Sequence, residues 1–257
     1  MVEYQTTPNK DPYANLIMQA FITNATIGVF INMVYLKPEV APAAFDPFYS
    51  IAAFMDTTKI QTLTEFISGQ IVPTIPRYAT PHSYPEHPLT DTIAMLCRFD
   101  WLTTTLEPTL SLFPRISNVL DTAPEVQSVT AATAGSLALA IQPISSNVVQ
   151  EGIRRGGNAL GLQATPQQWF TLDIAHWFAA DDESVHDATK GVLERIEDVT
   201  KEEGVYLPYQ FMNDASYDQD VIGHYGSENV DKLWAVSEKY DPEGVFQRLV
   251  PGGFKLP

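Results

Sequence analysis

Hydrophobic and polar residues alternate along several short segments of the chain, and strict alternation is typical of β-strands with one buried face. We predict strands over residues 26–36, 91–99, 126–133, 136–142 and 169–178. In the first of these, Ile27 and Ile31 share one face while Phe30 and Asn32 share the other. The chain is therefore rich in strands from end to end.

Other segments repeat their apolar residues at helical spacing. We predict helices over residues 11–24, 60–70, 106–120, 181–203 and 227–239. The helix over 181–203 is the clearest, because it opens with acidic residues that suit a helix N-terminus and ends at Gly204. The helix over 11–24 is inferred from Pro12 in a first turn, with Leu16, Ile17 and Ala20 on one side.

Strands separated by helices predict an α+β fold, with a large antiparallel or mixed sheet backed by helices on one face. We find no repeat and no linker that would divide the chain, so we expect one domain over 1–257. Its tail, 227–257, is predicted to be a helix followed by an extended end.

The formal charge of −16 argues against nucleic acid or an anionic membrane surface as a partner, because both would repel the protein. The first residues lack the basic and apolar regions of a signal peptide, and no apolar run reaches transmembrane length. We therefore expect a cytoplasmic protein. The single cysteine, Cys97, excludes an intrachain disulfide and lies in a strand pattern typical of a buried position.

Candidate chemistry begins in the strand over 169–178. One face carries Phe170, Leu172 and His176, and we expect helices to cover it; His176 is then either a hydrogen-bonded core residue or a catalyst. The other face carries Trp169, Asp173 and Trp177. A carboxylate between two indoles fits an apolar binding pocket, or else a partly solvated sheet surface. The five histidines are scattered, and no metal site is predicted.

A second candidate is the segment from Tyr206 to Gly226, YLPYQFMNDASYDQDVIGHYG. A short apolar and aromatic run ends there in Asn213 and Asp214, and a polar loop follows. Such residues either shape a turn or belong to a functional site.

This segment, together with DPYANLI at 11–17, VYLKPEVAPAAFDPFYSI at 34–51 and GGNALGL at 156–162, resembles the berberine-bridge-type FAD-linked oxidases of fungal secondary metabolism. The motifs occur in the family's order and correspond to its C-terminal half. The resemblance implies the family's substrate domain, an antiparallel sheet backed by helices. The family's N-terminal half, which binds FAD, has no counterpart here, and Gly156-Gly157 matches a substrate-domain turn rather than a phosphate loop. We therefore expect no bound cofactor.

One motif departs from the family. Its Tyr-x-Asn-Tyr step ends in a catalytic tyrosine, but this chain has Phe211-Met212-Asn213-Asp214, so Asp214 takes the position of the base. The resemblance also implies a sheet face directed at flavin and substrate, on which we place Phe30, Asn32, Arg98, Trp169, Asp173 and Trp177. Arg98 is expected to pair with Asp173 as a structural ion pair. Without a flavin half, this face needs a cover: a second copy of the chain, a ligand or a rearranged tail.

These observations predict a flavin-independent, redox-neutral cyclase, isomerase or dehydrating lyase, including Diels–Alder-type cyclisation, that acts on an apolar polyketide-like intermediate. Asp214 and Asp173 are the favoured acid/base residues, with His176 behind them. The expected substrate-binding residues are Phe30, Asn32, Arg98, Trp169, Trp177, Tyr209, Phe211 and Asn213. Two alternatives stay open: an FAD-dependent oxidoreductase whose flavin domain lies elsewhere, and a non-enzymatic binding or dimerisation module.

Overall fold

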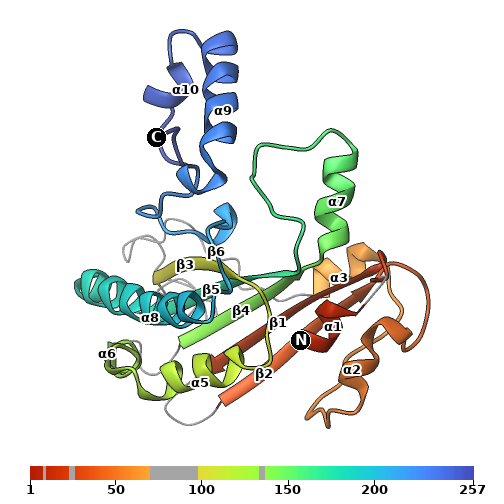
Figure 1. Cartoon of the computed structure of the whole chain (residues 1–257). Helices are drawn as coiled ribbons and strands as arrows, with labels where there is room; N and C mark the ends of the chain where they lie inside the picture. Colours follow the sequence, from red (N-terminus) through yellow and green to blue (C-terminus); the bar gives the residue numbers. More distant parts are fainter. Residues whose placement is uncertain (8–9, 23–26, 70–97, 133–136, 177) are drawn as a thin grey trace, which may run out of the picture.

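An antiparallel sheet of six strands forms the centre of the protein in a computed structural model, which describes residues 1–7, 10–22, 27–69, 98–132, 137–176 and 178–257 (Figure 1). Its order is β2-β1-β4-β5-β3-β6. The strands are β1 Ala14–Ile22, β2 Ile27–Tyr35, β3 Arg98–Leu106, β4 Leu137–Ile144, β5 Gln167–His176 and β6 Tyr206–Leu207. With helices on one face, the sheet confirms the predicted α+β class.

Helices precede, separate and follow the strands along the chain. The α-helices of the described residues are α1 Val2–Thr6, α2 Asp46–Tyr49, α3 Leu63–Gly69, α5 Leu112–Thr122, α6 Pro124–Ala132, α7 Ser146–Arg154, α8 Asp182–Glu202, α9 Ser227–Tyr240 and α10 Val245–Arg248. Helices α5, α6 and α8 cover one face of the sheet, whereas α9 and α10 project from the opposite side (Figure 1).

The main core lies between the sheet and α8. Leu172 and Ile174 of β5 are fully buried against an apolar stripe of α8 that includes Val192 and Ile196, and α5 and α6 close the sides. Burial of each such side chain contributes about 1.5–3 kcal/mol. The same face continues over β1 and β2, where Leu16 meets a smaller cluster with Tyr4, Phe45 and Phe48.

A third cluster lies on the opposite side of the sheet. It contains Tyr209, Val221, Ile222 and Tyr225, and the C-terminal residues Phe254 and Leu256 pack against it. The tail therefore covers part of the face that the helices α5, α6 and α8 leave free. Of the three predicted covers, the tail lies over part of this face, and a second copy and a ligand stay predictions.

Several predicted elements are confirmed: β2, β4, β5, α3, α8 and α9 occupy the expected segments. The prediction for residues 11–24 was wrong, because Ala14–Ile22 is strand β1 between β2 and β4. Every second side chain of β1, namely Leu16, Met18 and Ala20, is on the helix-covered face. The run is so short and so apolar that its sequence fits the period of a helix as well as that of a strand. The prediction for 126–133 was also wrong: α6 begins at Pro124 and buries Val126 and Val129, which are three residues apart as on a helix.

Boundaries differ in the middle of the chain. The strand predicted over 91–99 falls mostly outside the described residues, Cys97 included, and β3 continues to Leu106. The helix predicted from Leu106 begins instead at Leu112, which places Pro114 in its first turn, where proline is tolerated. Helix α7 was not predicted, and in the apolar and aromatic run before Asn213 the two residues of β6 form a strand.

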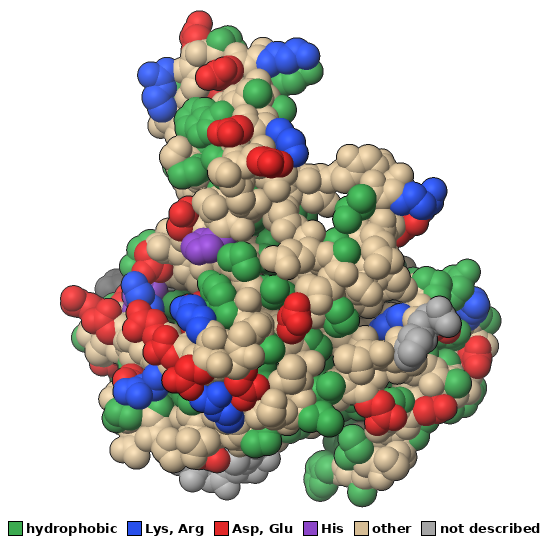
Figure 2. Space-filling model, viewed as in Figure 1, with side chains coloured by type: hydrophobic (Ala, Val, Ile, Leu, Met, Phe, Trp, Pro, Cys, Tyr) green, Lys and Arg blue, Asp and Glu red, His purple; other side chains and the backbone are tan. Residues whose placement is uncertain are grey.

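The surface carries interspersed charges, which Figure 2 shows most clearly over the part formed by α8. Ion pairs join α8 to its neighbours, such as Arg195 with Glu125 of α6 at 2.9 Å. Within the described residues, no group of three or more His, Cys, Asp or Glu side chains could hold a metal ion. None of the helices described is long and apolar enough to cross a membrane.

Leu172→Ala should lower the free energy of unfolding by about 2–5 kcal/mol, because it leaves a cavity in the fully buried centre of the sheet. Leu110→Ala makes the same chemical change at a side chain that is 80% exposed, and should cost less than about 0.5 kcal/mol. Urea denaturation measures both. Equal losses in the two variants would contradict the assigned core.

Candidate active site

The register of the strands separates two faces of the sheet. We call the side opposite α8 the open face. Asp173 of β5 stands on it between Trp101 of β3 and Ala138 of β4, and Thr171 stands between Thr103 and Ala140. On β1 and β2 the same face continues through four larger side chains: Gln19, Phe21, Phe30 and Asn32.

Two carboxylates meet on the open face. Asp173 projects from β5, and Asp214 reaches it from the short helix Met212–Asp214 that follows β6. The hydroxyl of Thr171 donates a hydrogen bond of 3.0 Å to Oδ2 of Asp214, so this carboxylate lies beside the strand position two residues before Asp173. The structure thus brings together the two acids that the sequence favoured.

Both carboxyl groups are shifted toward the protonated form. Burial, followed by the negative charges of Asp214 and Asp100, raises the pKa of Asp173 to about 7. Among the described residues, Oδ1 of Asp173 has no hydrogen-bond partner. Burial also raises the pKa of Asp214, although the hydrogen bond from Thr171 opposes that shift. Asp173 can therefore gain or lose a proton near neutral pH.

An aromatic wall stands beside the carboxylates. The indole of Trp169 stacks on Phe211 with 4.1 Å between ring centroids and lies 5.3 Å from the ring of Tyr209. The indole N–H donates to Oε1 of Gln167, and Nε2 of Gln167 donates to the carbonyl oxygen of Gln163. These bonds fix the orientation of Trp169.

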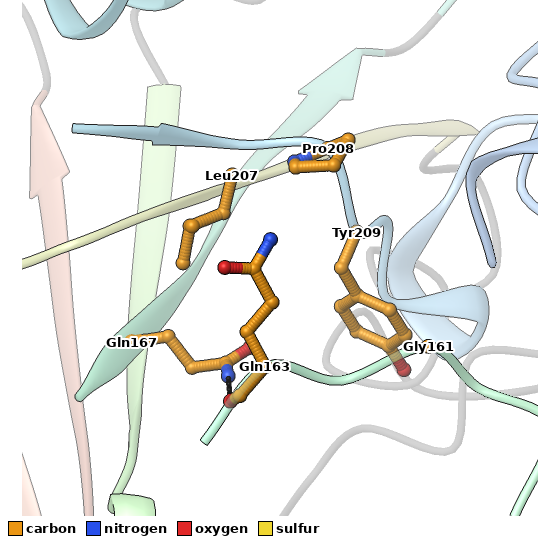
Figure 3. A pocket seen from close by; sticks show the side chains of 6 residues that line it. All are labelled: Gly161, Gln163, Gln167, Leu207, Pro208 and Tyr209. Atoms are coloured by element: carbon orange, nitrogen blue, oxygen red, sulfur yellow. Dashed lines mark hydrogen bonds between the residues drawn. The ribbon is translucent and has the colours of Figure 1, made fainter. Parts of the chain in front are cut away.

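Tyr209 belongs more to the core than to the wall, because it is buried and stacks on Tyr225 at 5.8 Å. Behind it is a cavity of about 10 Å³, room for roughly one water molecule. Figure 3 shows its lining: Gly161, Gln163, Gln167, Leu207, Pro208 and Tyr209. A substrate would therefore meet Trp169 and Phe211 from the open face rather than enter this cavity.

The strand beside Asp173 presents small side chains on the open face. Ala138 and Ala140 of β4 stand opposite Asp173 and Thr171, and beyond them lie Phe21 and Gln19 of β1. Phe30 on β2 is 48% exposed, and Asn32 donates to Gln19 at 3.3 Å. The predicted positions of Phe30, Asn32, Trp169 and Asp173 on one face are confirmed.

Arg98 was assigned to the wrong face. It stands opposite His176 in the register, on the side of α8, and it pairs with Asp182 rather than with Asp173. The error arose because Cys97 was interpreted as a buried position, which put its neighbour Arg98 on the opposite face; the register instead places Arg98 opposite His176 and Trp101 opposite Asp173.

His176 is buried on the predicted helix-covered face, and its Nε2 lies 2.7 Å from Oδ1 of Asp182. It is therefore separated from the two carboxylates by the sheet. Phe178, which follows the strand, is exposed. Asn213 lies exposed next to Asp214, and Trp177 is outside the described residues.

Three residues near the site were missed from the sequence. Trp101 would have emerged had the alternation been followed past Phe99. Gln219 and His186 hold the loop after Asp214 to β3 and α8, and no local pattern reveals contacts between segments so far apart.

FAD needs backbone N–H groups free to bind its phosphates. Gly156 and Gly157 follow the C-terminal end of α7, and their N–H groups donate to the carbonyl oxygens of Ile153 and Gly152. They terminate a helix and leave no N–H for a phosphate. This glycine pair therefore does not fit FAD, in agreement with its interpretation as a substrate-domain turn.

Asp173→Asn should stabilise the protein by roughly 1–3 kcal/mol at pH 8, because the wild type then carries a buried charge. The folded state keeps a proton on Asp173 up to a pKa of about 7, whereas the unfolded state loses it near pH 4. Wild-type stability should therefore fall as the pH rises between these values, and the variant should lack this fall. Urea denaturation across that range, with exposed Asp121→Asn as control, tests it; an unchanged slope would contradict the burial of Asp173.

Comparison with known proteins finds relatives over the whole chain. The chain is 31% identical over 245 residues to the bifunctional solanapyrone synthase of Alternaria solani, covering 95% of this chain and 42% of that protein. It is 32% identical over 256 residues to an FAD-dependent monooxygenase of Arthrobotrys oligospora, covering 99% of this chain and 45% of the relative. A shorter match, 42% identical over 120 residues, joins 46% of the chain to 23% of an FAD-dependent monooxygenase of Cochliobolus heterostrophus.

Among solved structures, a BBE-like protein of Arabidopsis thaliana aligns with 100% of the chain and 52% of its own length, with a TM-score of 0.46 and 10% identity. No protein-family model matches the chain. The chain spans somewhat less than half the length of the two curated relatives that it matches throughout. This agrees with the prediction that it corresponds to the C-terminal half of such proteins. The chain is thus similar over nearly its whole length to a fungal FAD-dependent monooxygenase and to solanapyrone synthase, in agreement with the resemblance predicted from its motifs.

Proposed function

We propose that the chain catalyses a redox-neutral cyclisation or isomerisation of an apolar, polyketide-like intermediate without a flavin. The observation that carries this proposal is the pair of carboxylates, Asp173 and Asp214, on a sheet face walled by aromatic rings. Each part of the reaction can be assigned to a side chain of this chain.

Asp173 is suited to be the general acid, because its raised pKa keeps a large share of it protonated near pH 7. Its O–H can donate to a substrate carbonyl, and this polarises a conjugated system toward ring closure. Asp214, held by Thr171, is then the base that removes a proton from the carbon next to that carbonyl. Return of a proton at another carbon completes an isomerisation with no net change in electrons.

The surroundings fit an apolar chain. Trp169 and Phe211 offer flat aromatic surface, and the small side chains of Ala138 and Ala140 leave room for a substrate beside the carboxylates. Contacts of this kind hold a flexible polyene in a folded conformer, and this accelerates ring closure by reducing the entropy lost in the reaction.

A second candidate is an FAD-dependent oxidoreductase, and the names of the relatives favour it. In that case a flavin-binding half on another chain or in a longer protein would face the open side of the sheet, and this chain would supply the substrate surface. A third candidate is a non-enzymatic binding or dimerisation module, which the exposed Phe30 favours.

Asp214→Asn should reduce turnover about 10²–10⁴-fold with the fold intact, as expected for loss of an acid/base group. The assay incubates the purified chain with linear unsaturated polyketides and follows product mass. Unchanged mass indicates cyclisation or isomerisation, loss of water indicates dehydration, and loss of two hydrogens indicates oxidation. Asp121→Asn is the matched control. Full activity of Asp214→Asn would remove this residue from the mechanism.

The absorption spectrum of the same sample, before and after incubation with FAD and gel filtration, separates the candidates. Turnover without a flavin band supports the redox-neutral enzyme. A retained flavin band with oxidised product would overturn it in favour of the oxidoreductase. Ligand retention without turnover would favour the binding module.

We also propose that a second copy covers the remainder of the open face near Phe30, which lies on β2 at one edge of the sheet. Phe30→Asp should then shift a concentration-dependent dimer toward monomer in sedimentation velocity. A wild-type monomer at all concentrations would contradict a homodimer.

A further inference from the structure

The loop after Asp214 is fastened to the edge of β3 by one side chain. Nε2 of Gln219 donates to the carbonyl oxygen of Thr103 at 2.8 Å, and the N–H of Thr103 donates back to Oε1 of Gln219 at 3.0 Å. The N–H of Ser216 donates to the same Oε1 at 3.1 Å. Gln219 therefore pairs with the backbone of β3 much as a neighbouring strand would.

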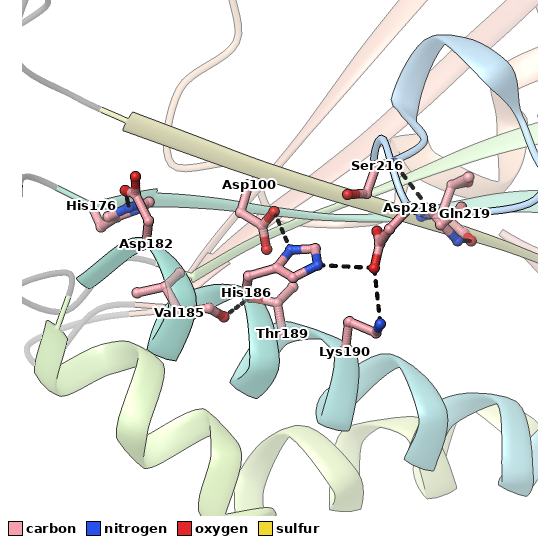
Figure 4. A network of polar contacts seen from close by, with 11 residues as sticks. Asp100, His176, Asp182, Val185, His186, Thr189, Lys190, Ser216, Asp218 and Gln219 are labelled. Carbon is pink, nitrogen blue, oxygen red and sulfur yellow. Dashed lines mark hydrogen bonds and ion pairs between the residues drawn. The ribbon is translucent and has the colours of Figure 1, made fainter. Parts of the chain in front are cut away.

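A second attachment joins this loop to α8 through His186. Nδ1 of His186 lies 2.9 Å from Oδ1 of Asp100 on β3, and Nε2 lies 3.1 Å from Oδ2 of Asp218 in the loop. Figure 4 shows the imidazole between the two carboxylates, with Lys190 one helical turn further along α8. Lys190 also contacts Oδ2 of Asp218, at 2.9 Å, and the ring of Tyr217 stacks on the imidazole at 5.5 Å between centroids.

This geometry selects the charged form of His186. A neutral imidazole donates from only one nitrogen, whereas here both nitrogens face carboxylate oxygens. Burial alone would lower the pKa of His186, but the hydrogen bonds to Asp100 and Asp218 outweigh burial and raise it. In the described part of the chain, the other oxygen of Asp100 is buried without a partner, so this carboxylate depends on the imidazolium.

We propose that His186 is a positioning residue that holds the loop bearing Asp214 against β3 and so keeps Asp214 beside Thr171. What Asp214 does there rests on the proposed function; the positioning itself rests on the contacts. Asp214 lies only four residues before Asp218, so release of Asp218 leaves the loop attached to the sheet by Gln219, and Asp214 by Thr171.

The attachment through His186 weakens as the pH rises. Because folding raises the pKa of His186, its contribution is complete below the ordinary value of about 6.5 and is lost as the pH rises through the folded-state value. The charged groups around it are Asp100 on β3, Asp218 in the loop and Lys190 on α8. Deprotonation leaves the imidazole one N–H for two carboxylates, so either Asp100 or Asp218 loses its hydrogen bond from His186, while Lys190 still contacts Asp218.

Hydrogen–deuterium exchange of residues 215–222 in the purified chain tests this, with rates corrected for intrinsic base catalysis. In the wild type, protection of this loop should fall at least about tenfold as the pH rises through the titration of His186. In His186→Gln the loop should be less protected at low pH, and the pH step should vanish. Arg195→Gln, which breaks the pair with Glu125 on another side of α8, is the matched control and should keep the wild-type step.

Asp218→Asn tests the same attachment without leaving the buried Asp100 unpaired, and should lose protection in the same way even if His186→Gln fails to fold. Wild-type protection and an unchanged pH step in Asp218→Asn would overturn the proposal. The exchange experiment does not depend on turnover. If the loop loses protection in these variants but Asp214→Asn is fully active, the positioning role of His186 holds and the catalytic role of Asp214 is refuted.

Discussion

Strand β5 is the element on which both the fold and the candidate site depend. Paired on both edges, by β3 and β4, it directs alternate side chains to opposite environments. Leu172 and Ile174 anchor the sheet to α8, while Thr171 and Asp173 face the other way. Because the period of a strand is two residues, a slip of one residue would bury the carboxylate in the core and expose the leucine. The core therefore fixes the register that presents the chemistry.

The environment of Asp173 opposes stability. A carboxyl group that burial keeps protonated near neutral pH costs free energy once it ionises, and a neighbouring carboxylate increases this cost. Perturbed acids of this kind cluster at functional sites, where the same environment makes them effective proton donors. The large core between the sheet and α8 offsets the cost, so the acid is tolerated where a weaker scaffold would lose it.

The predictable parts of this structure are those with a strong local period. Helix α8 and strand β5 were predicted from the sequence because the apolar residues of each follow a single period, helical in α8 and alternating in β5. Strand β1 did not, because Leu16, Ile17 and Ala20 satisfy a helix as well as a strand, and only its position between β2 and β4 decides. The partner of Arg98 needed the register of β3 against β5, which places Arg98 opposite His176 on the side of α8. Asp214 was found through a family resemblance, whereas the contacts of His186 join three segments that no local pattern relates.

The side chain of Gln219 has a consequence for association between molecules. By occupying the N–H and carbonyl of Thr103, it closes the exposed edge of β3, beyond which β6 pairs only with Thr105 and Leu106. Open strand edges are templates on which other chains add strands, and proteins protect them. The loop that carries the candidate base thus also protects the edge of β3 from pairing with another chain. Without the side chain of Gln219, the N–H and carbonyl oxygen of Thr103 would be open to pairing with a strand of another chain.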